Sequence, residues 1–229
     1  MKIKGILFDC GGTLIRPIGG SFWPGPYFRD TLSKYGVEGL DWNRLELASK
    51  EGMDYLEKHH CILTEQEERE QLYKYYAIVL KVLGLSDPPE YLLRKLADIA
   101  VDLIEFEPFP ETKSVLENLN KKNYRLCVVS NAWPSLERKL YEVGLGNYFD
   151  AFVISSKVGG FKPDERVYTT AIEKTGLPAE DLLFIDDYLE YAQKARQMGM
   201  TALVISRDAQ QHPSEIPVIN SLEEVKNYL

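Results

Sequence analysis

The sequence predicts an α/β protein, a doubly wound parallel sheet with an all-helical block inserted after its first strand. Three observations carry this prediction. Residues 2–14, KIKGILFDCGGTL, form an apolar run of strand character that ends at Asp9 and turns into a glycine pair. After residue 110, candidate helices and strands alternate strictly, as they do in parallel sheets. Between these two regions, from Tyr27 to about Phe106, the periodicity is helical and no strand interrupts it.

Composition indicates an ordinary globular chain without nucleic-acid or membrane partners. The 229 residues are 45% hydrophobic and 27% charged, enough for one domain or one domain with an insertion. The formal net charge of -8 argues against nucleic acid and anionic membranes, because both select clustered Lys and Arg. No run reaches transmembrane length, and the N-terminus lacks the apolar core and cleavage site of a signal peptide.

The three cysteines are an odd, sparse set without metal-ligand spacing: Cys10, Cys61 and Cys127. We expect reduced thiols and a cytoplasmic location. Cys10 is next to Asp9, so a redox role is one reading. Alternation along the strand favours the other, a small buried apolar filler.

The first strand is predicted to be buried on both faces, since Ile3, Ile6, Leu7 and Phe8 precede Asp9. Asp9 is then held at the carboxyl edge of the sheet, where open parallel sheets bind their ligands. The following glycines allow unusual backbone angles, and backbone N–H groups exposed there can cradle an oxyanion. The alternative is that the Asp-x-Gly-Gly sequence only forms a turn, in which Asp and Gly are common, and has no functional role.

The segment Ile15–Pro26 is rich in Gly and Pro and is predicted to be an irregular hinge. Helical periodicity follows. Thr64 and Glu67 have capping-box spacing, and Pro88-Pro89 favour a helix start. The four predicted helices are Tyr27–Tyr35, Asp41–His59, Glu65–Leu83 and Glu90–Phe106. The third carries an apolar stripe typical of a helix-bundle core, made of Leu72, Tyr75, Tyr76, Val79, Leu80 and Leu83.

Alternation of helices and strands begins after the proline-marked boundary Glu107–Pro110. The predicted helices are Glu111–Lys122, Ser135–Val143, Glu165–Thr175 and Tyr191–Met198, and the predicted strands are Arg125–Ser130, Ala151–Ser155, Leu182–Asp186 and Thr201–Ile205. Ser221 and Glu224 are expected to cap a closing helix. The first strand needs these strands as neighbours, so residues 1–15 and 108–229 are expected to form one domain and residues 16–107 a helical one.

Polar residues stand at the ends of the predicted strands. They are Asp9, Ser130-Asn131, Asp186-Asp187 and, in the loop GGFKPD, Lys162. Taken singly, each has an ordinary explanation as a cap, a turn or a solvated side chain. Together they converge on one sheet edge, where crowded carboxylates resist ionisation unless a cation such as Mg²⁺ lies among them. Such a site suits a transferring phosphoryl group, with Asp9 as the nucleophile.

At these residues the sequence resembles the haloacid dehalogenase (HAD) superfamily of hydrolases, over the whole chain. FDCGGTL resembles its first motif, VVSN its second, the Lys of FKPD its third and FIDD its acidic fourth, while the helical insertion resembles its mobile cap. The resemblance implies a Rossmann-like core and an aspartyl-phosphate intermediate on Asp9. It further implies that Ser130 and Lys162 hold the phosphoryl group and that Mg²⁺ binds Asp9, the Gly11 carbonyl, Asp186 and Asp187.

Substrate contacts are expected from Gly12 and Thr13 in the first loop and from Asn131. Trp23 and Tyr27, in the hinge and cap, are the candidate residues that select the substrate. The expected substrate is a small phosphorylated metabolite.

One position departs from the family pattern. Gly11 stands where family phosphatases usually carry a second aspartate as general acid/base. Such a group contributes about 10²–10⁴-fold, whereas enzymes accelerate phosphate-monoester hydrolysis by up to roughly 10²¹-fold, so its loss slows a phosphatase without abolishing it. Tyr191 stands at the family's later acidic or amide position, which makes Asp187 the expected substitute ligand or orienting group.

The predicted function is therefore a Mg²⁺-dependent phosphohydrolase. A metal-independent 2-haloacid dehalogenase is the first alternative, since the position of Gly11 is not acidic in those relatives, although they typically lack a double aspartate like Asp186-Asp187. A catalytically silent binding or regulatory protein is the second.

Overall fold

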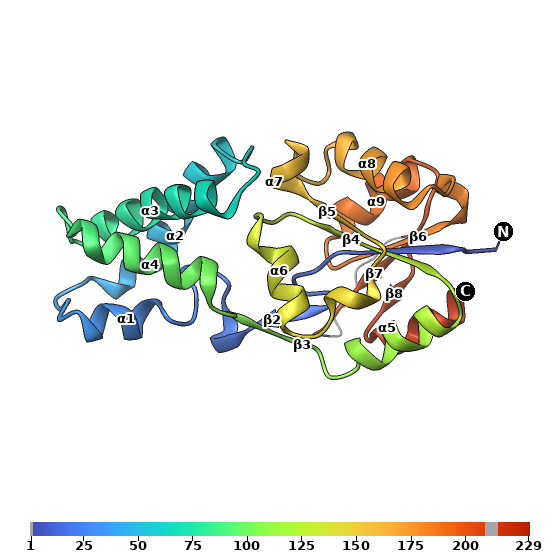
Figure 1. The fold of residues 1–229 in the computed structure, drawn as a ribbon, viewed down its shortest axis with the longest axis horizontal. Helices are drawn as coiled ribbons and strands as arrows, with labels where there is room; N and C mark the ends of the chain where they lie inside the picture. Colours follow the sequence, from blue (N-terminus) through green and yellow to red (C-terminus); the bar gives the residue numbers. More distant parts are fainter. Residues whose placement is uncertain (1, 209–214) are drawn as a thin grey trace. The chain divides into compact units, whose positions relative to one another are not determined.

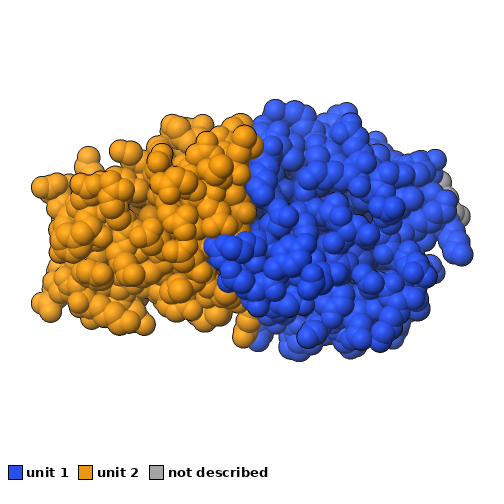
Figure 2. Space-filling view, in the orientation of Figure 1, with its two compact units in different colours: residues 1–16, 108–132, 136–229 blue, residues 17–107, 133–135 orange. Residues whose placement is uncertain are grey.

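The computed structural model describes residues 2–208 and 215–229 (Figure 1). The chain forms two compact units, which Figure 2 shows in different colours. Unit 1 consists of Met1–Arg16, Pro108–Ala132 and Leu136–Leu229, and unit 2 of Pro17–Glu107 and Trp133–Ser135.

Unit 1 is built on a six-stranded sheet with the order β5-β4-β1-β6-β7-β8, in which the pairs are parallel. The strands are β1 Gly5–Phe8, β4 Arg125–Ser130, β5 Ala151–Ile154, β6 Leu182–Asp186, β7 Thr201–Ile205 and β8 Val218–Ile219. β1 lies between β4 and β6, and Ile6, Leu7 and Phe8 have no exposed surface. The predicted fold class is therefore confirmed.

Helices cover both faces of this sheet. They are α5 Thr112–Lys121, α6 Ser135–Glu142, α7 Ser155–Val158, α8 Glu165–Thr175 and α9 Leu189–Gln197. Figure 1 shows α8 and α9 on one side of the strands and α5 on the other. The closing helix is a 3₁₀ segment, Leu222–Tyr228, and the predicted capping box of Ser221 and Glu224 is present. Apolar side chains of α8 and α9 complete a core cluster with Leu7, Val129 and Phe184.

Unit 2 is helical, with α1 Phe28–Lys34, α2 Leu45–Lys58, α3 Glu65–Val82 and α4 Glu90–Asp102. The capping box of α3 is present as predicted, because Glu67 N donates to Thr64 Oγ1 at 3.2 Å and Thr64 N donates to Glu67 Oε2 at 2.9 Å. The predicted stripe on α3 is buried in the core of this unit. None of the helices in the described parts of the chain combines the length and apolarity that a bilayer span requires.

Two predicted boundaries were wrong. The helix expected over Glu90–Phe106 ends at Asp102, and Phe106 begins a short strand, β3 Phe106–Pro108. Its partner is β2, Ile15–Pro17, so the segment expected to be an irregular hinge begins with a strand. Helical periodicity cannot reveal this pairing, because the partner strand lies about 90 residues away in the sequence.

The segment Trp133–Ser135 belongs to unit 2 although the residues on both sides of it belong to unit 1. The Trp133 indole N–H donates to Gln71 Oε1 at 3.2 Å. Ser135 donates twice to Glu68, from its backbone N at 2.8 Å and from its hydroxyl at 2.6 Å. The chain therefore enters the helical unit a second time, only three residues after Ser130, which the sequence did not predict.

Candidate active site

The sheet register brings Asp9 and Asp186 side by side. Phe8 pairs with Ile185 in the parallel ladder of β1 and β6, so the next residue of each strand is an aspartate at the carboxyl edge. Asp9 N donates to the Ile185 carbonyl at 2.9 Å, which extends the ladder by one residue. Both side chains are withdrawn from water, with Asp9 6% and Asp186 0% exposed.

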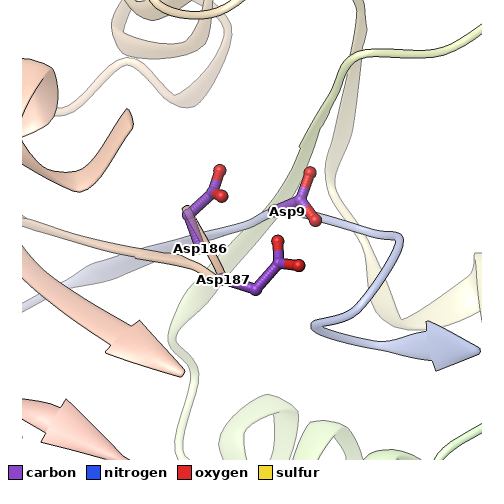
Figure 3. Close-up of side chains that lie close together, drawn as sticks. All are labelled: Asp9, Asp186 and Asp187. Carbon is purple, nitrogen blue, oxygen red and sulfur yellow. The ribbon is translucent and has the colours of Figure 1, made fainter. Parts of the chain in front are cut away.

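Asp187 completes a cluster of three carboxylates. Asp9, Asp186 and Asp187 each offer an oxygen, and these three atoms lie within 4.8 Å of one another (Figure 3). The residues expected to bind a metal through side chains are thus gathered at one point, from the ends of β1 and β6. Oxygen-only donor sets of this kind suit hard cations such as Mg²⁺.

Lys162 bridges two of these carboxylates. Its Nζ lies 2.6 Å from Asp9 Oδ1 and 2.6 Å from Asp186 Oδ2, and its side chain is 1% exposed. Burial by itself lowers the pKa of Lys162, but the charges of Asp186 and Asp9 outweigh it and raise the pKa far above its ordinary value. The ammonium is therefore charged, and the reading of Lys162 as a solvated loop residue is excluded.

Asn131 holds the backbone of Lys162 at two points. Lys162 N donates to Asn131 Oδ1 at 2.7 Å, and Asn131 Nδ2 donates to the Lys162 carbonyl at 3.3 Å. In this structure the Asn131 amide positions the lysine loop, and its expected contact with substrate stays a prediction. The Tyr191 ring packs against the Lys162 ammonium, with its centroid 5.2 Å from Lys162 Nζ.

The charges of the cluster do not balance. Burial, with a further contribution from Asp9, raises the pKa of Asp187 to about 8. Burial also raises the pKa of Asp186, to about 7, although Lys162 opposes the shift. Three carboxylates and one ammonium would carry two net negative charges when ionised, which a divalent cation would neutralise. The residues present therefore fit Mg²⁺ in charge and in donor type.

The loop after β1 needs a glycine at position 12. Gly12 has φ +79°, and a Cβ there would lie 2.3 Å from Asp187 Oδ2, so both the backbone conformation and the close approach exclude a side chain. Gly11 is not among the glycines with positive φ in the described residues. Thr13 is completely buried, and its Oγ1 has no hydrogen-bond partner within the described parts of the chain.

The remaining expected site residues lie in both units. Ser130 ends β4 and is 4% exposed. Trp23 and Tyr27 belong to unit 2, where Trp23 makes edge contacts with Tyr75 and Trp133 at centroid distances of 5.1 and 5.2 Å. Tyr27 Oη donates to the Ile104 carbonyl at 3.0 Å. Both side chains thus have partners inside the helical unit, and their contact with substrate stays a prediction.

Cys10 is 1% exposed, and burial followed by the charge of Asp9 raises the pKa of its thiol. This confirms the reading of Cys10 as a small buried filler. Arg207, in contrast, was missed. Its Nε donates to the Gly12 carbonyl at 3.3 Å across 195 residues of sequence, and no local pattern around Arg207 could have revealed such a partner.

Comparison with known proteins agrees with this geometry. The family model described as haloacid dehalogenase-like hydrolase matches residues 43–205. A glyceraldehyde 3-phosphate phosphatase of Methanothermobacter thermautotrophicus is 27% identical over 197 residues, covering 80% of this chain and 79% of its own. The (S)-2-haloacid dehalogenase H-109 of Pseudomonas putida is 30% identical over 128 residues, covering 56% and 55%.

Solved structures share the fold. A HAD-hydrolase from Bacillus subtilis, crystallised with bound magnesium, superposes with a TM-score of 0.72 at 18% identity and covers 100% of this chain and 99% of its own. At this identity the similarity shows the fold alone. The family match spans more than half of the sequence, and the chain belongs to the haloacid dehalogenase-like hydrolases.

Proposed function

We propose that this hydrolase is a Mg²⁺-dependent phosphatase that acts on a small phosphorylated metabolite through an aspartyl-phosphate on Asp9. The observation that carries the proposal is the cluster in which the buried Lys162 ammonium binds two buried carboxylates, Asp9 and Asp186, while a third, the partly buried Asp187, lies beside them. Such an excess of buried negative charge is costly unless a divalent cation accompanies it. The phosphatase name of the relative from Methanothermobacter thermautotrophicus supports the same reaction.

Asp9 would act as the nucleophile. Lys162 holds its Oδ1 at 2.6 Å, and the described residues place no hydrogen-bond donor on Oδ2. We infer that Oδ2 attacks phosphorus while the ester P–O bond breaks, and that the leaving oxygen takes a proton from water, since Gly11 supplies none. A second water then attacks phosphorus, the bond to Asp9 breaks, phosphate departs and the carboxylate is restored.

The proposed magnesium ligands are the side chains of Asp9, Asp186 and Asp187 and the backbone carbonyl of Gly11. When bound, the ion would offset the charge that develops on the phosphoryl oxygens. Lys162 contributes a fixed positive charge to the same site, and Ser130 is proposed as a donor to the phosphoryl group. Thr13 would contribute its backbone N–H group, whereas the Gly12 N–H already donates to the Ile15 carbonyl at 2.8 Å.

For the substrate we infer a short phosphorylated carbohydrate. Relatives from Methanothermobacter thermautotrophicus and Methanocaldococcus jannaschii are both named glyceraldehyde 3-phosphate phosphatase, and the latter is 24% identical over 97% of this chain. Glyceraldehyde 3-phosphate is therefore the first compound to test. Trp23 and Tyr27 remain the candidate selecting residues in the helical unit.

We also propose that unit 1 acts as a core domain and unit 2 as a cap domain that moves during turnover. The predicted division into residues 1–15 and 108–229 and residues 16–107 differs from these units at Arg16 and at Trp133–Ser135. The Bacillus subtilis relative is reported to show interdomain movement, which supports this view. The three free cysteines support a cytoplasmic location.

A haloacid dehalogenase is the second candidate, favoured by the relative from Pseudomonas putida and by the non-acidic Gly11. The Asp186-Asp187 pair weighs against it, because a metal-free site has no use for two further carboxylates beside the nucleophile.

One experiment separates the candidates. Phosphate release from a panel of phosphorylated metabolites, and halide release from L-2-chloropropionate, are measured with Mg²⁺ and with EDTA, using Asp9→Asn as the control. We expect phosphate release that requires Mg²⁺ and Asp9. Halide release in EDTA would establish the dehalogenase instead, and substrate binding without any turnover would establish a silent protein.

A further inference from the structure

All three guanidinium nitrogens of Arg207 donate hydrogen bonds, and two of them bind the loop that follows Asp9. Nε donates to the Gly12 carbonyl at 3.3 Å, and the two terminal nitrogens donate to the Thr13 carbonyl and to Glu111 Oε1. The group also lies over the Phe109 ring, 3.7 Å from its centroid. The side chain is 19% exposed, so these contacts are made largely out of water.

The loop after Asp9 cannot hold these two carbonyls by itself. Its internal hydrogen bonds run from Gly12 N to the Ile15 carbonyl at 2.8 Å and from Leu14 and Ile15 N to the Cys10 carbonyl. None of them uses the carbonyl of Gly12 or Thr13. Arg207, near the other end of the chain, is the donor to both.

The Gly12 carbonyl and the Thr13 N–H belong to one peptide group. Fixing the carbonyl therefore fixes the direction of the N–H. The positively charged guanidinium bound to the carbonyl oxygen also polarises the peptide group, which makes its N–H a stronger donor. Within the described parts of the chain, the Thr13 N–H has no hydrogen-bond acceptor. A fixed N–H without an acceptor, at the loop that follows the nucleophile, can stabilise an oxyanion.

Arg207 is itself held in place. Burial raises the pKa of Glu111, but the hydrogen bond and charge of Arg207, together with hydrogen bonds from the backbone of Glu111 and Leu222, leave that pKa below its ordinary value. Glu111 also accepts from Ser221 Oγ and Leu222 N, both at 3.4 Å, which connects the arginine to the closing 3₁₀ segment. A lysine could not reproduce this arrangement, because its ammonium is a compact point charge and lacks the planar set of N–H donors of a guanidinium.

We infer that Arg207 is a positioning residue of the active site, which orients the Gly12–Thr13 peptide toward the phosphoryl group. This inference rests on the proposed phosphatase function. It predicts that losing Arg207 reduces the rate of phosphoryl transfer more than the affinity for the rest of the substrate.

The test compares Arg207→Gln and Arg207→Lys with the native enzyme on p-nitrophenyl phosphate. We expect kcat to fall about 10- to 100-fold in Arg207→Gln, with partial recovery in Arg207→Lys. Arg138→Lys is the matched control, because Arg138 pairs with Glu142 on the surface of α6 in the same unit. Its kcat should stay within about twofold of the native value.

A kcat for Arg207→Gln within twofold of native would overturn the inference. Binding of inorganic phosphate, measured by calorimetry on protein shown to be folded by circular dichroism, gives a second readout that needs no turnover. We expect about tenfold weaker binding in Arg207→Gln, and equal binding would overturn the inference. If the native protein binds phosphate but hydrolyses no ester, the proposed function fails while this comparison still decides the role of Arg207.

Discussion

Each unit of the molecule holds an acidic side chain that is buried or partly buried, and the surroundings of the two acids are opposite. Glu68 in the helical unit is 4% exposed, and both its carboxylate oxygens accept hydrogen bonds from Ser135, at 2.8 and 2.6 Å. Asp187 in the sheet unit receives no side-chain donor among the described residues, and burial raises its pKa to about 8.

We infer from this difference that Glu68 stabilises the fold, whereas Asp187 is available to bind a ligand. A buried carboxylate with its hydrogen bonds satisfied contributes to stability, whereas one without them lowers stability until a partner arrives. Exchanging an acid for its amide should therefore have opposite effects on stability in the two units.

The largest expected effect is that of Asp9→Asn. The amide keeps the shape of the side chain but loses the nucleophilic oxygen, so phosphate release should fall by about 10⁴-fold or more. Thermal unfolding, followed by circular dichroism, should show the variant to be folded. Turnover at the native rate would remove Asp9 from the mechanism.

Asp187→Asn should lower activity and raise stability together. Losing one ligand should cost about 100-fold in Mg²⁺-dependent rate. In EDTA the free energy of unfolding should rise by about 1 kcal/mol, because the amide needs neither a cation nor a bound proton in the folded state. Mg²⁺ affinity is measured by titrating activity, and stability by urea unfolding. A variant that is less stable in EDTA would mean that Asp187 serves the fold, as Glu68 does.

The pH dependence of stability sharpens the same comparison. The folded-state pKa values of Asp186 and Asp187, about 7 and about 8, lie above the ordinary aspartate value. Between about pH 4 and 8 the folded state therefore binds more protons than the unfolded state, and stability falls as pH rises, by at most about 1.4 kcal/mol per pH unit for each group.

Mg²⁺ should reduce the dependence of stability on pH, because the bound ion takes the place of the protons on Asp186 and Asp187. Urea unfolding at several pH values, in EDTA and in Mg²⁺, measures both slopes. Identical slopes in the two conditions would place the ion away from these aspartates.

Glu68→Gln should destabilise the helical unit by about 1–3 kcal/mol, because the amide cannot accept from Ser135 with both of its polar atoms. For a chain of this size each kcal/mol corresponds to about 2–4 °C in Tm. Glu117→Gln, which removes an exposed pair with Lys121, is the control and should change stability by less than about 0.5 kcal/mol. Equal stability losses in the two variants would contradict the structural role of Glu68.

The smallest effect is expected from Gly11→Asp, which adds an acid to the cluster. Without one, no acidic side chain at this position protonates the leaving oxygen, so the native enzyme should prefer aryl, acyl or enol phosphates to simple alkyl phosphates. The variant should gain about tenfold on alkyl esters alone, and because Gly11 is not at positive φ, its backbone accommodates a side chain. Rates plotted against leaving-group pKa for both proteins decide the matter, and a flat native plot would mean that another group supplies the proton.

Much of the fold follows from local sequence. The strands Arg125–Ser130, Leu182–Asp186 and Thr201–Ile205 have the predicted bounds, as does the helix Glu165–Thr175. Apolar runs and capping residues act over a few positions, so these elements are encoded where they form. The aspartates could likewise be expected at one edge, since parallel strands share their carboxyl ends.

The sequence by itself thus determined the sheet, the helical insertion and the residues that crowd the sheet edge. Tertiary structure alone decided how they are held: Asn131 bound to the Lys162 backbone, Trp133–Ser135 built into the helical unit, and Arg207 on the Gly12 and Thr13 carbonyls. Each of these three features depends on hydrogen bonds between residues that lie 31 to 195 positions apart in the sequence. Such contacts leave no periodic trace in the sequence, because either partner alone is an ordinary polar residue that water could satisfy equally well.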